Sequence, residues 1–189
     1  MRLDKARNMY KNIAGTFISL FKSRSEALTS ARDADPRTFV ESYFYPLLGV
    51  FAITLFVGRL IHLGTFDVAE LLRYSLAKLS ALILSYYLIS LSFRYLFEKY
   101  FNKSFTIPKM QIYVGYILSV DIVVGMLIEF SFPEFLEALS LYIIVLLWEG
   151  SRSFLQLEEE KRLANTLMAI FVFFGIKWFV SFFFNKLIL

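Results

Sequence analysis

Six ionisable side chains interrupt otherwise apolar stretches of this sequence, and they are its main candidates for chemistry. They are Lys78, Arg94, Asp121, Glu129, Glu149 and Lys177. A charge at bilayer depth is costly unless it is paired, hydrated or neutralised by a proton. Two kinds of chemistry follow: ion pairs that keep a helix bundle neutral, or a relay that moves protons or ions across a membrane. The depths and directions of the segments that carry these residues decide between them.

The sequence offers little for other reactions. It has no cysteine, which excludes disulfides, thiolate metal sites and cysteine nucleophiles. The single histidine, His62, stands at the end of an apolar stretch, where we expect a polar side chain at the interface rather than a ligand or base. No Gly-x-Ser-x-Gly motif, P-loop or metal-ligand spacing occurs. We therefore predict no enzymatic activity and no cofactor or metal.

Apolar stretches of about 20 residues lie between clusters of charge, and this distribution is typical of a helical membrane protein. The chain is 58% hydrophobic and only 19% charged. The fold class predicted is all-α, a polytopic bundle of transmembrane helices. We expect five spans, at about 42–63, 75–97, 111–132, 135–154 and 164–189. Pro46 suits the first turn of the first span, and Ala77, Ala81 and Ser85 form a small-residue stripe that permits close helix packing.

The orientation follows from the basic residues, which favour cytoplasmic loops. Lysines and arginines are frequent before residue 42 and in the second and fourth loops, whereas the first and third loops hold only Arg73. The N-terminus is therefore predicted to be cytoplasmic and the C-terminus to lie on the opposite side.

This topology gives each buried charge a depth. Asp121 and Lys177 each lie about 12 or 13 residues from the cytoplasmic start of their span, so they match in depth and oppose in sign. Lys78 and Glu129 both lie toward the outer side, and Arg94 and Glu149 toward the inner side. Pairing by sign and depth favours three structural ion pairs, and the relay stays as the alternative.

The polar head, residues 1–41, contains one amphipathic stretch. Its apolar face comprises Met9, Ile13, Phe17 and Leu20, with lysines and arginines around it. Either this helix rests on the cytoplasmic membrane surface or it packs on the inner ends of the bundle. The segment Arg32–Thr38, around Pro36, indicates a break before the first span.

Several short patterns resemble the Yip-domain family of five-span, Rab-interacting-factor-like membrane proteins. They are Pro36–Phe39, Tyr45–Leu47, Tyr116–Ser119, Phe132–Pro133, Leu141–Tyr142, Leu147–Gly150 and Glu158–Lys161. Asp121 and Glu149 depart from the family pattern. The resemblance implies five spans, a cytoplasmic N-terminus and no catalytic residues. Eukaryotic members are implicated in Rab GTPase binding, whereas the short head favours a bacterial inner-membrane relative.

The function expected is therefore that of a non-enzymatic integral membrane protein. It would act as a scaffold, bind partner membrane proteins or a second copy of itself, or organise the lipid bilayer, without nucleic acid. The alternative is a small transporter or ion conductor that uses Asp121, Lys177 and Glu149.

Overall fold

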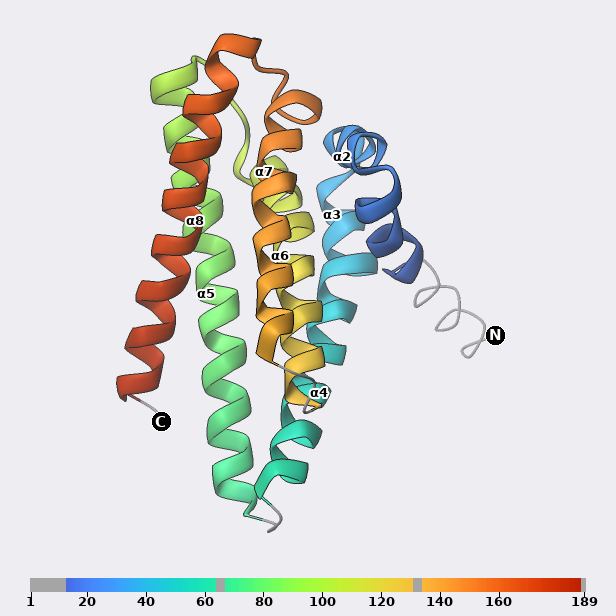
Figure 1. The fold of residues 1–189 in the computed structure, drawn as a ribbon, viewed down its shortest axis with the longest axis vertical. Helices are drawn as coiled ribbons and strands as arrows, with labels where there is room; N and C mark the ends of the chain where they lie inside the picture. The colour runs from blue at the N-terminus through green and yellow to red at the C-terminus, as the bar shows by residue number, and fades with distance from the viewer. Residues whose placement is uncertain (1–12, 64–66, 131–133, 188–189) are drawn as a thin grey trace.

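The computed structural model describes residues 13–63, 67–130 and 134–187, and within these ranges every regular element is a helix. The all-helical prediction is confirmed for these residues. The elements are a head helix Ile13–Lys22, α2 Arg24–Asp33, α3 Pro36–Phe39, the π-helical η1 Val40–Phe44, α4 Tyr45–Leu63, α5 Val68–Phe101, α6 Ile107–Glu129, the 3₁₀-helical η2 Glu134–Leu141, α7 Tyr142–Ser153 and α8 Glu159–Leu187. Figure 1 shows one elongated bundle in which α4, α5, α6, α7 and α8 run in alternating directions.

Four helices in the described part of the chain are long and apolar enough to cross a membrane. They are Pro36–Ile61, Val68–Phe101, Ile107–Glu129 and Glu159–Lys186. The predicted fourth span at 135–154 is not among them. It is divided into the 3₁₀ segment η2 and an α7 of only 12 residues, and Glu149 and Arg152 make the end of α7 polar. Four candidate spans are thus present, and the prediction of five is not confirmed.

The start of the first span differs from the prediction. The helical run begins at Pro36 rather than near residue 42, because the Asp35 carboxylate accepts a 2.8 Å hydrogen bond from the Thr38 backbone N–H and caps the helix. That bond also holds the pKa of Asp35 below its ordinary value. Pro46 is therefore not in the first turn. It is the second residue of α4 and lies two residues after the end of η1, whose wider i→i+5 hydrogen bonding (Tyr45 N–H to Val40 O) accommodates the missing proline N–H.

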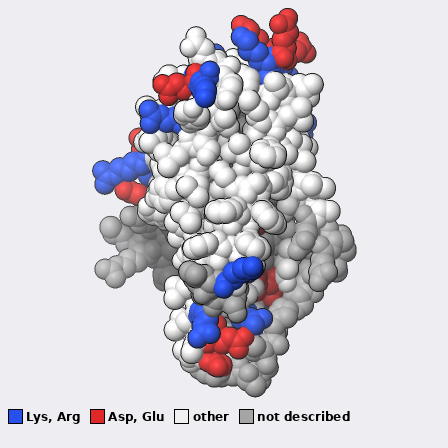
Figure 2. Space-filling view, turned by 90° about the vertical axis from the view of Figure 1, so that its left-hand side faces the viewer, with Lys and Arg blue, Asp and Glu red and all other residues white. Residues whose placement is uncertain are grey.

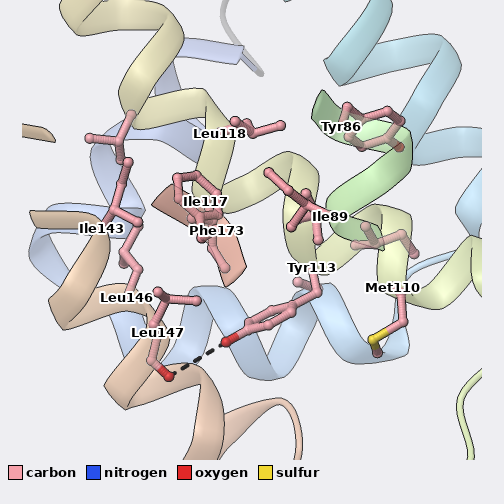
Figure 3. Close-up of a cluster of buried hydrophobic side chains, with 14 of the residues drawn as sticks. Tyr86, Ile89, Met110, Tyr113, Ile117, Leu118, Ile143, Leu146, Leu147 and Phe173 are labelled. Atoms are coloured by element: carbon pink, nitrogen blue, oxygen red, sulfur yellow. Dashed lines mark hydrogen bonds between the residues drawn. The ribbon is translucent and has the colours of Figure 1, made fainter. Parts of the chain in front are cut away.

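Helix α6 lies at the centre of the bundle, in contact with α2, α4, α5, α7 and η2. Most of its side chains from Met110 to Val124 are buried. Figure 3 shows how Tyr113 packs among Ile89 of α5 and Leu146 and Leu147 of α7, with its hydroxyl directed at the Leu147 carbonyl. This cluster lies on the same side of Asp121 as the start of α6, and it fills that half of the bundle.

The head helix packs on the protein itself. Leu20 is fully buried, and Ile13 and Phe17 lie against the core, while Met9 is outside the described residues. The Tyr142 hydroxyl of α7 donates a 2.8 Å hydrogen bond to the Leu20 carbonyl. Of the two placements expected for this helix, the structure therefore favours packing on the bundle. On the face that could have rested on the membrane, Leu20 is covered by protein and Ile13 and Phe17 are partly covered.

The outer surface of α5 and α8 is suited to lipid. Figure 2 shows that on this side of the molecule the charged side chains gather toward the two ends and leave a broad uncharged band between them. On α8, Phe171 is 81% exposed and Trp178 is 70% exposed, whereas Phe173 on the other face is fully buried. The small residues Ala77, Ala81 and Ser85 of α5 are buried, as a stripe for close helix packing requires.

The approach of α6 and α7 depends on Gly150. A Cβ atom added at Gly150 would overlap the Tyr113 ring, whereas one added at Gly175 of α8 would meet nothing within 4 Å. Tyr113 has no room to withdraw, because it is fully buried and stacks on Phe154 with 4.8 Å between ring centroids.

We predict that Gly150→Ala destabilises the bundle by about 1–3 kcal/mol, the usual cost of overpacking. Gly175→Ala is the matched control, since it adds the same methyl group to a helix interior where space is open, and it should leave the melting temperature unchanged or raise it. Thermal unfolding in detergent compares the two variants. Equal melting temperatures would show that α6 and α7 are not packed this closely.

Candidate functional site

A partly open cavity of about 440 Å³ lies among α4, α5, α6, α8 and η2. Its lining includes four charged side chains, Lys78, Asp121, Glu129 and Lys177. Three serines, Ser85, Ser140 and Ser181, also border it, and apolar residues such as Phe51 and Leu55 complete the walls. This is the largest gathering of polar groups inside the apolar part of the described bundle, and it makes the cavity the candidate site.

Asp121 and Lys177 form an ion pair across the cavity wall. The Lys177 ammonium donates a hydrogen bond to Asp121 Oδ1 and joins α8 to α6. The side chain of Asp121 is only 17% exposed and that of Lys177 only 25% exposed. In such surroundings an unpaired charge is strongly disfavoured. The structure thus brings together the two residues that were matched in depth and sign, and each neutralises the other.

Lys78 and Glu129 line the same cavity but do not pair with each other. Glu129 instead accepts a 2.5 Å hydrogen bond from the Tyr74 hydroxyl. The Lys78 ammonium lies over the Tyr74 ring, 5.6 Å from its centroid. The predicted direct pair does not form in the structure, and Tyr74, one turn before Lys78, contacts both side chains instead.

Arg94 and Glu149 are not brought together either. Arg94 is exposed on α5, whose inner face at this level is formed by the buried rings of Phe93 and Phe97. Glu149 is half-buried on α7 and accepts a 2.8 Å hydrogen bond from the Ser153 hydroxyl of its own helix. Matching depth did not ensure contact here, since the two side chains point in different directions from the helix axes. Neither residue lines the cavity.

Sequence patterns did not reveal the polar network beside the site, where the end of α4 meets the start of α5. Arg59 of α4 pairs with Glu70 of α5 at 2.6 Å, and its guanidinium lies 4.8 Å from the Tyr74 ring centroid. Tyr74 therefore lies near two cations, Arg59 and Lys78, and bonds to one anion, Glu129. The i, i+4 spacing of Tyr74 and Lys78, together with Glu70 four residues before Tyr74, is the signal that could have indicated one shared helix face.

This chain matches no protein-family model, no curated protein and no solved structure. Within the described ranges, no group of three His, Asp or Glu side chains could hold a metal ion. The functional proposals therefore rest on the fold and on the chemistry of the cavity.

The ion pair makes a direct prediction. Asp121→Leu and Lys177→Leu should each lower the free energy of unfolding, because each leaves one charge without its partner. The loss should stay below the roughly 3–5 kcal/mol of a fully enclosed pair, since the cavity admits some water. The double variant should recover much of the loss, as measured by melting temperature in detergent.

Arg94→Leu and Glu149→Leu provide the control for this cycle. These two side chains do not touch, so their effects should add. Additive losses for Asp121 and Lys177 as well would contradict a direct pair.

Proposed function

We propose that this chain is a five-span integral membrane protein of the Yip-domain kind, with its N-terminus in the cytoplasm, that acts without catalysis as a membrane scaffold or partner-binding protein. The membrane we propose for it is a bacterial inner membrane. Four of the described helices are long and apolar enough for a multi-pass membrane protein.

The fourth span in this proposal, the one that is not among the four candidate helices, is the segment formed by η2 and α7. A 3₁₀ helix rises about 2.0 Å per residue and an α-helix about 1.5 Å. The eight residues of η2 and the 12 of α7 together extend roughly 34 Å by these rises, and a bilayer core is about 30 Å thick. The two pieces, end to end, have the length of a span that neither has alone.

The contacts of the family-like patterns support a structural use for them. Phe39 stacks on Tyr116 at 5.0 Å, and Ser119 accepts a 2.8 Å hydrogen bond from Tyr43. Gly150 adjoins Tyr113. Phe39 and Tyr116 belong to two different patterns, whereas Ser119 and Gly150 each contact a tyrosine outside the patterns. All these contacts lie where α6 packs on α3, η1 and α7, as expected if the patterns hold a bundle together rather than perform a reaction.

The observation that carries the scaffold proposal is the packing beside the cavity. On the side of Asp121 toward the start of α6, Ile117, Leu118 and Tyr113 are fully buried. Apolar and aromatic side chains fill most of this half of the bundle, and its buried polar side chains, such as Ser119 and Asn165, hydrogen-bond to other protein side chains. On α6 the cavity lining begins at Asp121 and does not extend toward the start of the helix, so a charged solute or proton leaving the cavity on this side would meet closely packed side chains. A polar cavity closed at one end suits binding better than conduction.

A transporter or ion conductor is the second candidate, and the cavity itself favours it. Asp121 and Lys177 line the cavity. For conduction, the bundle would have to repack so that a polar path continues from these two residues to the other side of the membrane. Glu149 takes no part in this cavity, so the conductor would rely on Asp121 and Lys177 alone.

The topology can be tested with reporter fusions. Fusions at Asn102 and Gln156 should both report the cytoplasm, and a fusion after Leu189 should report the opposite side. These positions follow α5, α7 and α8. A cytoplasmic C-terminus would mean an even number of spans and would contradict the five-span proposal.

The scaffold and transporter candidates differ in liposomes. With the purified protein reconstituted beside a pH- or ion-sensitive dye, we expect no flux above that of protein-free vesicles, because the packed half of the bundle blocks the cavity. Selective flux that is lost in Asp121→Asn but kept in Glu149→Gln would overturn the scaffold proposal in favour of transport.

A further inference from the structure

Two charges in the cavity have no ionic partner among the described residues. Asp121 and Lys177 neutralise each other, and this leaves Lys78 on α5 and Glu129 at the end of α6. The neutral Tyr74 hydroxyl donates one hydrogen bond to Glu129. The Lys78 ammonium lies over the Tyr74 ring, 5.6 Å from the ring centroid. The cavity therefore presents one cation and one anion, and Tyr74 contacts both of them.

Both groups have free capacity to bind. An ammonium has three donors, and a carboxylate has about four acceptor positions, of which Tyr74 fills one. A ligand with only one charge would satisfy one of the two groups and leave the site with a net charge. A ligand with both an anion and a primary ammonium would satisfy the two groups together and add no net charge to a membrane-embedded cavity.

The position of the two residues indicates where such a ligand comes from. Glu129 lies eight residues beyond Asp121 on α6, roughly 12 Å closer to the end of the helix. Lys78 lies in the third turn of α5, near the same end of the bundle, and Ser140 and Ser181 border the cavity with them. In the five-span topology this end faces the outer leaflet, at the depth where lipid headgroups lie. The volume of about 440 Å³ suits a headgroup or a small metabolite.

We propose that this cavity binds a zwitterion of the phosphoethanolamine class, with the phosphate at Lys78 and the primary ammonium at Glu129. The serine hydroxyls at the rim are additional donors for phosphate oxygens. The acyl chains of a lipid would lie against the exposed apolar surface of the neighbouring helices. The outer-leaflet source rests on the proposed topology, whereas the charge chemistry of the site does not.

The test uses the delipidated full chain in detergent and native mass spectrometry. Phosphatidylethanolamine, phosphatidylcholine and phosphatidylglycerol are added separately at equal concentration. Phosphatidylethanolamine should be retained best, because the quaternary choline cannot donate an N–H to Glu129 and phosphatidylglycerol has no cation. Equal retention of phosphatidylethanolamine and phosphatidylglycerol by the unaltered protein would overturn the proposal, without any need for a variant.

Variants locate the binding. Lys78→Gln and Glu129→Gln should each reduce phosphatidylethanolamine retention about tenfold, the usual effect of losing one charge-assisted hydrogen bond. Arg94→Gln and Glu149→Gln likewise remove one cation and one carboxylate, but outside the cavity, and should retain the lipid. Unchanged retention in folded Lys78→Gln and Glu129→Gln would also overturn the site.

Soluble glycerophosphoethanolamine, a phosphodiester with one anion, one primary ammonium and no net charge, distinguishes the two sources of the ligand. Failure to displace the lipid at millimolar concentration assigns the site to a membrane lipid, and full displacement assigns it to the free zwitterion; both outcomes support the charge chemistry. Reporter fusions and liposome flux test the topology and the scaffold role separately, so this inference can fail while they stand.

Discussion

The structure depends on the burial of α6 on nearly all its sides. Lipid tails are as apolar as leucine, so helices in a membrane associate through close packing and polar contacts rather than through the hydrophobic effect. The glycines and aromatic rings of α6 and its neighbours provide that packing, as at Gly150 and Tyr113. Because α6 also carries Asp121, its position at the centre requires a counter-charge from another helix. Lys177 of α8 provides it, so one ion pair fixes the α8 register against the core.

The described part of the polar head packs on this core, even though the head is rich in charged residues. The Lys109 ammonium at the start of α6 donates 2.7 Å hydrogen bonds to the carbonyls of Arg32 and Ala34, which end α2. A cation there also complements the negative end of the α2 dipole. Ser25 and Ser153 share a further hydrogen bond at 2.9 Å. A partner or a membrane surface at this end of the described bundle would therefore meet a head packed on the core, with Ile18 and Phe21 exposed.

Sequence patterns predicted the features of this fold that depend only on position along a helix axis. The lengths of the apolar stretches located four helices, and opposite charge at equal depth predicted the pairing of Asp121 with Lys177. The misses concern direction and local geometry. Depth does not say where a side chain points around its helix, so Arg94, next to the buried Phe93, points away from Glu149. Tyr74, which contacts both Lys78 and Glu129, belongs to no charge pattern. The π turn before Pro46 depends on backbone bonds that composition does not encode.

The bundle is divided into a packed half and a polar half, and this division constrains any activity. Opening a path from Asp121 through the packed half would require Tyr113 to leave its stack on Phe154 and the contact at Gly150 to part. Several fully buried side chains would lose their packing at once, which makes such an opening costly. Binding at the polar half requires no such change, because the cavity already exists and its paired and unpaired charges are already in place. The least costly use of this architecture is therefore to hold a polar ligand at one side of the membrane while the other side stays rigid.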